Sequence, residues 1–190
     1  MAAQSHHRYS IKLIRLLGSS SNPACHMERL ISALGGFLGI SAIIFITRYF
    51  VSSDDAMLVI ASIGGSAVLL FIVPENPSSQ PWPLVGGHLI PATIGITCAT
   101  MIPDLLIAAG VTLSTTILAM YYLKCIHPPG AATALTAVVG GESIRQLGYQ
   151  FLLLPVGIDV MVMLCAAIFV NYLSTRWFPK RNYPASSKPQ

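Results

Sequence analysis

The sequence His127-Pro128-Pro129-Gly130 places a titratable ring, two rigid residues and a glycine inside a chain that is otherwise mostly apolar. Proline is tolerated at the first position of a helix, because the N–H group that it lacks would be unpaired there. The pattern therefore predicts a short helix that begins at Pro128, with His127 just before its start. The free N–H groups and the positive dipole at such a start suit a small anion, and we include Ala131 in the same predicted site.

A second run of small residues, Gly64-Gly65-Ser66, interrupts the middle of another apolar segment. Residues 65–70 resemble residues 130–135, and both runs precede a polar stretch. We interpret the two runs as the starts of half-helices in an internal repeat, as in transporters that are built from duplicated halves. A half-helix of about 12 residues is about 18 Å long, roughly half the hydrocarbon thickness, so both starts are expected near the bilayer midplane.

His127 has two interpretations, and both stay open. It contacts the anion, or it forms a hydrogen bond to a neighbouring backbone group and holds the helix break in place. The other candidates for proton coupling or for a polar lining are Asp159, His88, Lys124 and Thr133. Asp159 lies deep in an apolar segment, where a carboxylate must be paired, hydrated or protonated, so its pairing with a hydroxyl or with His127 is an equal alternative to proton coupling.

The remaining polar candidates fit the membrane better than they fit catalysis. Lys124 follows a predicted span, so it either attracts the anion or extends to the membrane interface, and His88 is expected to form a hydrogen bond near an interface. No covalent enzyme chemistry is expected, because Ser66 has no paired acid and base. A zinc site would need a third ligand beside His88 and His127, so the sequence predicts neither a metal nor a cofactor.

The composition identifies the environment of the chain. Of its 190 residues, 54% are hydrophobic and only 9% are charged, about a third of the charged share in soluble domains. We infer an integral membrane protein. The net charge of +4 comes mainly from residues before the first and after the last apolar segment, so both termini are predicted to be cytoplasmic and the number of crossings even. Such tails leave no folded basic face for nucleic acid.

Four apolar segments are long enough to cross a membrane: residues 28–50, 82–102, 105–123 and 149–173. The predicted fold is an all-α membrane protein of four transmembrane helices and two re-entrant half-helix segments, arranged as two parallel internal repeats. The predicted domains are a cytoplasmic basic tail (1–27), a transmembrane domain (28–175, with repeats of about 28–102 and 103–175) and a second cytoplasmic basic tail (176–190).

An ordered set of motifs resembles the HPP family of small integral membrane proteins, which is named for the sequence His127-Pro128-Pro129. The resemblance covers residues 54–175 and continues in the basic sequence Arg181-Asn182-Tyr183-Pro184. The motifs that carry it are residues 65–71, Pro74 with Pro77, residues 80–82, 86–89 and 127–135, and Gly140-Gly141. Members are described as four-helix membrane proteins, and the plastid and cyanobacterial members resemble nitrite transporters. The resemblance thus implies transport of nitrite or a similar small monovalent anion.

The leading hypothesis is therefore an anion transporter or channel in the lipid bilayer of a bacterial inner (plasma) membrane. Two alternatives stay open: a non-transporting structural or partner-binding membrane protein, and a cation or metal transporter that uses His127, His88 and Asp159. Because four short crossings leave little room for a wide pore, we also expect a homo-oligomer.

Overall fold

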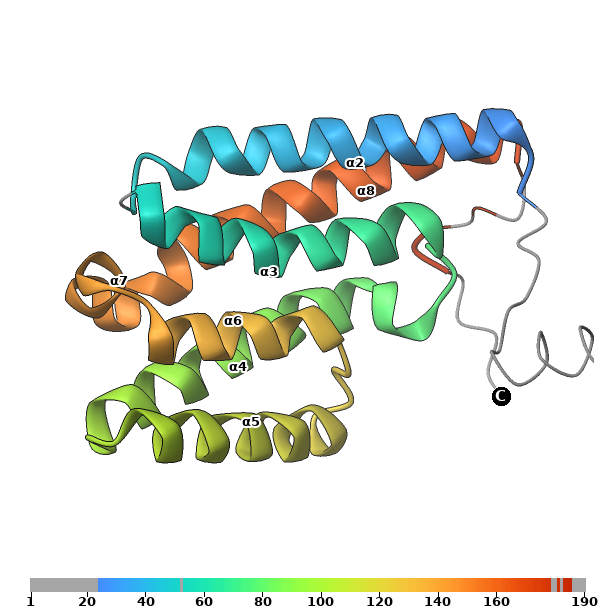
Figure 1. Cartoon of the computed structure of the whole chain (residues 1–190). Coiled ribbons are helices and arrows are strands. Elements are labelled where there is room, and N and C mark those ends of the chain that lie inside the picture. The colour runs from blue at the N-terminus through green and yellow to red at the C-terminus, as the bar shows by residue number, and fades with distance from the viewer. Residues whose placement is uncertain (1–23, 52, 179–180, 182, 186–190) are drawn as a thin grey trace, which may run out of the picture.

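The computed structural model describes residues 24–51, 53–178, 181 and 183–185, so most of the two predicted basic tails lies outside the described residues. The described residues are helical throughout, with short connections (Figure 1). The longer helices are α2 (His26–Thr47), α3 (Ser53–Ile72), α4 (Pro81–Met101), α5 (Leu105–Tyr122), α6 (Pro128–Val139) and α8 (Ile158–Thr175). The short elements are η1 (Pro77–Ser79), α7 (Glu142–Leu147), η2 (Gly148–Leu152) and η3 (Leu153–Gly157).

Five of the described helical segments are long and apolar enough to cross a membrane, so the prediction of four crossings is wrong. The additional span is α3. The helices run back and forth along one common direction, and α6 makes a further, shorter pass from the end of α5 to the opposite end of the bundle (Figure 1). The start of α2 and the end of α8 consequently lie at the same end, which we call the terminal end. The side of the membrane on which the two tails lie stays a prediction.

Helix α3 is continuous through Gly64-Gly65-Ser66, so the predicted half-helix that starts there is wrong. An interrupted helix in an apolar setting would leave backbone groups unpaired at several kcal/mol each, whereas a glycine within a helix costs about 1 kcal/mol. Gly65 has a packing role instead, because a Cβ atom added there would lie 3.2 Å from Pro129 Cγ. The two segments predicted as repeat copies differ, since α3 has 20 residues and α6 only 12.

Helices α4 and α6 approach each other closely at positions where only glycine fits. A Cβ atom on Gly130 would lie 1.5 Å from the Gly87 carbonyl oxygen, and one on Gly95 would lie 2.3 Å from the Ala134 carbonyl oxygen. Small residues allow backbones of neighbouring helices to touch in this way. The tight α4–α6 pair brings the beginning of α6 against the first turns of α4.

Helix α5 presents most of its surface outward. Its buried residues follow one another at spacings of four, namely Ala108, Thr112, Thr116 and Met120. The other large apolar residues of this helix are exposed, for example Leu106 and Tyr122. A narrow buried stripe beside a wide exposed apolar surface suits a helix at the edge of a bundle in lipid.

Candidate functional site

Two histidines and a serine from three elements meet inside the bundle. Ser66 lies on α3, His88 lies on α4, and His127 is the residue that precedes α6. The Ser66 Oγ atom is 2.7 Å from Nε2 of His88 and 2.7 Å from Nε2 of His127. The two imidazole centroids are 5.0 Å apart, and all three side chains have no exposed surface.

Hydrogen bonds continue outward from both rings. Nδ1 of His127 is 2.7 Å from the carbonyl oxygen of Ser78 in η1. On the other side, Nδ1 of His88 is 2.6 Å from Thr133 Oγ1, which is 3.1 Å from Ser62 Oγ. Ser62 then donates to the Val59 carbonyl oxygen at 2.8 Å. We call this series the polar chain; its members are the Ser78 carbonyl, His127, Ser66, His88, Thr133, Ser62 and the Val59 carbonyl.

The local sequence explains how His127 reaches α3. A Cβ atom on Gly87 would lie 2.4 Å from His127 Cβ, so the glycine beside His88 leaves the space that the second histidine occupies. The backbone of His127 is extended (φ −141°, ψ 95°), and its side chain makes no capping hydrogen bond to α6. Both nitrogens of its ring are therefore available to Ser66 and Ser78. Of the two interpretations of His127, hydrogen bonding to a neighbouring backbone group is observed.

The first three residues of α6 do not offer the free N–H groups that the sequence predicts for an anion. Pro128 and Pro129 have no N–H, and the N–H of Gly130 donates to the His127 carbonyl oxygen at 2.9 Å. Gly130 is also buried against the Gly87 backbone. Ala131 is the next residue of the helix, half-buried one position further in. Pro128, Pro129 and Gly130 thus have no free N–H group for an anion, and anion binding at the predicted residues stays a prediction.

The polar chain extends from η1 at the terminal end toward the middle of the bundle. Ser66 precedes the end of α3 by six residues, and His88 follows the start of α4 by seven. At about 1.5 Å per residue, both side chains lie about 9–10 Å from that end. The depth of these residues in a bilayer stays a prediction, and α6 starts where α5 ends rather than halfway along a span (Figure 1).

Three further predicted site residues, Gly64, Lys124 and Asp159, are also not members of the polar chain. Gly64 faces α2, since a Cβ atom there would lie 3.9 Å from Ile40. Lys124 is an exposed residue of the connection after α5, with a φ of 54°. Asp159 is fully buried and accepts a hydrogen bond from Thr47 at 2.6 Å, while its Oδ1 atom has no partner among the described residues. Pairing of Asp159 with a hydroxyl is thus confirmed, and pairing with His127 is wrong.

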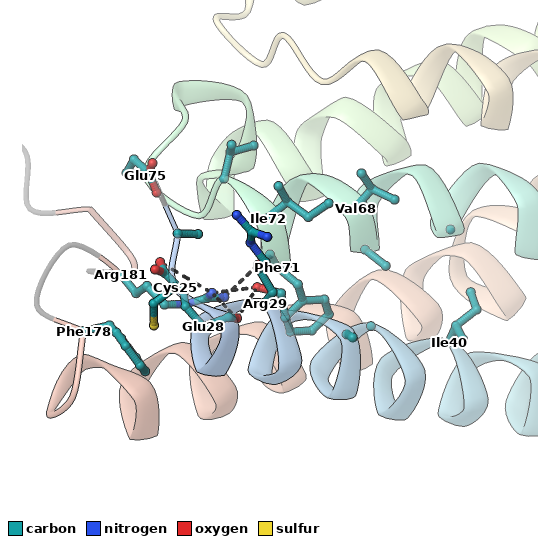
Figure 2. A pocket seen from close by; sticks show the side chains of 17 residues that line it. Cys25, Glu28, Arg29, Ile40, Val68, Phe71, Ile72, Glu75, Phe178 and Arg181 are labelled. Carbon is teal, nitrogen blue, oxygen red and sulfur yellow. Dashed lines mark hydrogen bonds and ion pairs between the residues drawn. The ribbon is translucent and has the colours of Figure 1, made fainter. Parts of the chain in front are cut away.

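A cavity of about 1140 Å³ opens between α2 and α3 at the terminal end (Figure 2). Arg181 lines it, and this side chain donates through all three guanidinium nitrogens. Its acceptors are Asn171 Oδ1, the Phe71 carbonyl, Ser32 Oγ and the Glu28 carbonyl. The five N–H groups of Arg181 are accordingly occupied in joining the C-terminal segment to α2, α3 and α8, rather than free for a ligand.

Sequence reasoning identified both histidines, Ser66 and Thr133 but missed Ser62 and the Ser78 carbonyl. Ser62 and Ser66 are four residues apart, so on a helix they lie on one face, and this spacing was the available signal. It was overlooked because the segment was interpreted as broken at Gly64-Gly65. No sequence pattern indicated that the carbonyl of Ser78 would accept a hydrogen bond from a ring 49 residues away.

Comparison with known proteins places the chain among membrane proteins. The sequence model of a family described as "HPP, transmembrane region" matches residues 21–184. A transmembrane protein of Dictyostelium discoideum is 34% identical over 157 residues, covering 80% of this chain and 49% of the relative. A second transmembrane protein of that organism is 32% identical over 155 residues, covering 80% of this chain and 53% of the relative. The chain thus spans about half the length of the curated relatives that it matches. No solved structure matches.

Proposed function

Because the chain belongs to the HPP family of transmembrane proteins, we propose that it transports nitrite or a similar small monovalent anion across a membrane. The observation that carries the proposal is the pair His88 and His127, fully buried in a bundle of apolar helices. Ionisable side chains at such depth are costly and in membrane proteins usually mark a substrate or ion pathway. Here the two rings share one hydroxyl, so the donors that an anion needs are already gathered within a few ångströms.

In this proposal, side chains recognise the anion, rather than backbone N–H groups at the starts of helices. The donors are the ring nitrogens and the Ser66 hydroxyl, which in this conformation bond to one another. An anion with two oxygens would replace those mutual contacts when α3 separates from the closely packed α4–α6 pair. Gly65 of α3 faces Pro129 at the beginning of α6, whereas the Gly87–Gly130 contact lies within the α4–α6 pair and stays closed. Opening at the Gly65–Pro129 contact gives the site access to the terminal end.

The direct test is nitrite uptake into liposomes that contain the purified protein. We expect uptake well above protein-free liposomes, and a loss of about 10-fold or more in His127→Ala and His88→Ala, since a hydrogen bond to a charged group contributes about 1.5–3 kcal/mol. Ser114→Ala is a matched control, because Ser114 is an exposed hydroxyl on α5 that bonds only to its own helix. Absence of uptake by a folded wild-type protein would overturn the proposed function.

One observation favours a second candidate, a non-transporting membrane protein that serves a structural or partner-binding role. Both histidines are closed from solvent, and Gly130 in the first turn of α6 is packed against α4. A polar chain that only joins three helices would look the same in this conformation. The uptake measurement separates the two candidates, because a structural role predicts that the histidine variants lose stability and that no anion moves.

Other features of the assembly are part of the proposal. We propose a homo-oligomer in the bilayer, supported by the wide exposed apolar surface of α5. Placement in a bacterial plasma membrane, with both termini cytoplasmic, stays a prediction, and both relatives come from Dictyostelium discoideum. We do not propose cation transport, because Asp159, in the first turn of α8, bonds to Thr47 and does not join the two histidines.

A further inference from the structure

The polar chain contains six close contacts, and each needs one hydrogen to be a hydrogen bond. From one end to the other they join Ser78 O to His127, His127 to Ser66, Ser66 to His88, His88 to Thr133, Thr133 to Ser62, and Ser62 to Val59 O. Both ends of the chain are backbone carbonyl oxygens, which accept and never donate. Every hydrogen must therefore come from the five side chains between them.

Those five side chains supply one hydrogen too few when both rings are neutral. A neutral imidazole carries one N–H, and each of Ser66, Thr133 and Ser62 carries one O–H. Five hydrogens cannot complete six contacts, so in the neutral chain one contact joins two acceptor atoms with no hydrogen between them. An unsatisfied buried polar contact is destabilising, and one added proton removes it.

We propose that the polar chain is a binding site for one proton, held by His88 and His127 as a single imidazolium between them. With the sixth hydrogen, the rings and hydroxyls donate outward to both terminal carbonyls and every contact is satisfied. No covalent bond other than one N–H is made, and the proton comes from water. The hydroxyls do not hold the charge, because an imidazole is far more basic than an alcohol.

A second proton would not fit. If both rings were doubly protonated, both Nε2–H groups would point at the Ser66 oxygen, and the hydrogen of that hydroxyl would have no acceptor within the chain. Two positive charges on rings with centroids 5.0 Å apart would also repel each other in a medium that screens poorly. The pair consequently titrates as one unit with one proton.

No carboxylate among the described residues neutralises this charge. The partners of the two rings are hydroxyls of α3 and α6 and a carbonyl of η1, while Met120 of α5 packs at Gly130 and Cys125 packs at Gly86. The described buried charged side chains are Asp55, Asp159 and Arg181, and they bond to other groups. A protonated pair is thus a buried cation without a counter-ion. On the basis of the proposed function, the transported monovalent anion is the counter-ion of this buried cation.

The proton site can be tested without any transport measurement. The protein is purified in detergent with ¹⁵N-labelled histidine, and the ring nitrogens are followed by NMR between pH 8 and pH 4. His88→Gln and His127→Gln assign the two buried rings. We expect the wild-type pair to gain one imidazolium charge in total as the pH falls.

Two variants remove the shortage of hydrogens. Thr133→Val leaves four contacts with four hydrogens, and Ser66→Ala does so at another point of the chain, so in both the rings gain no hydrogen bond from protonation. We expect proton binding at least about tenfold weaker, which lowers the midpoint by one pH unit or more. Thr133→Ser keeps the hydroxyl and should titrate as the wild type does.

Three outcomes would overturn the proposal: two buried rings that stay neutral down to pH 4 in the folded protein, two charges gained together, or variants that titrate like the wild type. Circular dichroism at each pH confirms that the fold persists. If Thr133→Val does not fold, Ser66→Ala carries the comparison. None of these outcomes depends on whether an anion is transported, so failure of the proton site and failure of the proposed function are distinguishable.

Discussion

His88 and His127, 39 residues apart in the sequence, turn their Nε2 atoms to the same hydroxyl oxygen and stand with ring centroids 5.0 Å apart. Their Nδ1 atoms point away from each other, one to a hydroxyl and one to a carbonyl. This arrangement uses all four ring nitrogens. Protonation of either ring therefore changes the hydrogen bonds that are open to the other ring.

Removal of the shared hydroxyl should impair transport more than removal of a hydroxyl elsewhere. In Ser66→Ala we expect nitrite uptake by liposomes to fall about 10-fold, because both rings lose the group that orients them. Ser114→Ala should stay within about twofold of the wild type, since its hydroxyl bonds to Gly110 of the same exposed helix. Equal uptake by the two variants would contradict a role for Ser66 in the site.

Anion uptake should move no net charge if the protonated pair carries the anion. When the membrane potential is changed by about 60 mV with potassium and valinomycin, we expect the protein-dependent initial rate to change by less than about twofold. An uncoupled anion would respond strongly, since about 60 mV is worth about 1.4 kcal/mol per charge, or a tenfold ratio. Protein-free liposomes provide the control for nitrous acid that crosses lipid unaided. Strong dependence on potential would contradict coupling to one proton.

The Gly87–Gly130 contact should be intolerant of any side chain. Gly130→Ala would place its Cβ atom 1.5 Å from the Gly87 carbonyl oxygen, a contact between backbones that cannot relax by a side-chain rotation. We expect a loss of about 3 kcal/mol or more of stability, measured by thermal unfolding in detergent. Gly110→Ala is the matched control, since a Cβ atom there meets nothing within 4 Å. That control should be neutral or stabilising by about 0.5–1 kcal/mol, as expected for glycine replaced within a helix.

Arg181 should be irreplaceable by lysine. A lysine keeps the charge but cannot supply the five planar donors that reach Asn171, Phe71 and Ser32 at once. We expect Arg181→Lys to lower stability by about 2–4 kcal/mol. Arg29→Lys, at an exposed position that lines the same cavity, should have little effect. Similar melting temperatures for the two variants would show that the charge alone matters.

Asp159 should not take part in the proton step. Its carboxylate bonds to Thr47 at the end of α2, whereas the polar chain begins near the terminal end. In Asp159→Asn we expect nitrite uptake within about twofold of the wild type and an unchanged titration of the two rings. A loss of proton-dependent uptake in this variant, with the ring titration preserved, would instead assign the coupling to Asp159.

The sequence by itself determined that this is a membrane protein and that a helix, α6, starts at Pro128. The low charge and the apolar segments require a membrane, and Pro128-Pro129 begin α6 because proline fits the first turn of a helix and breaks what precedes it. Local rules of this kind need no knowledge of distant residues. For the same reason His127 was identified as a residue outside the helix start, where its backbone is extended.

The tertiary structure decided the rest. Gly64-Gly65 predicted a break, but α3 continues because a helix buried among apolar neighbours cannot leave its backbone unpaired, and Gly65 instead makes room for Pro129. Packing of α4 on α6 then covers Gly130, one of the residues that the sequence predicts for an anion site. It also joins His127, His88 and Ser66, which are separated by 22 and 61 residues in the bonded pairs. Contacts between distant segments depend on the close packing of whole helices, and no local sequence pattern predicts them.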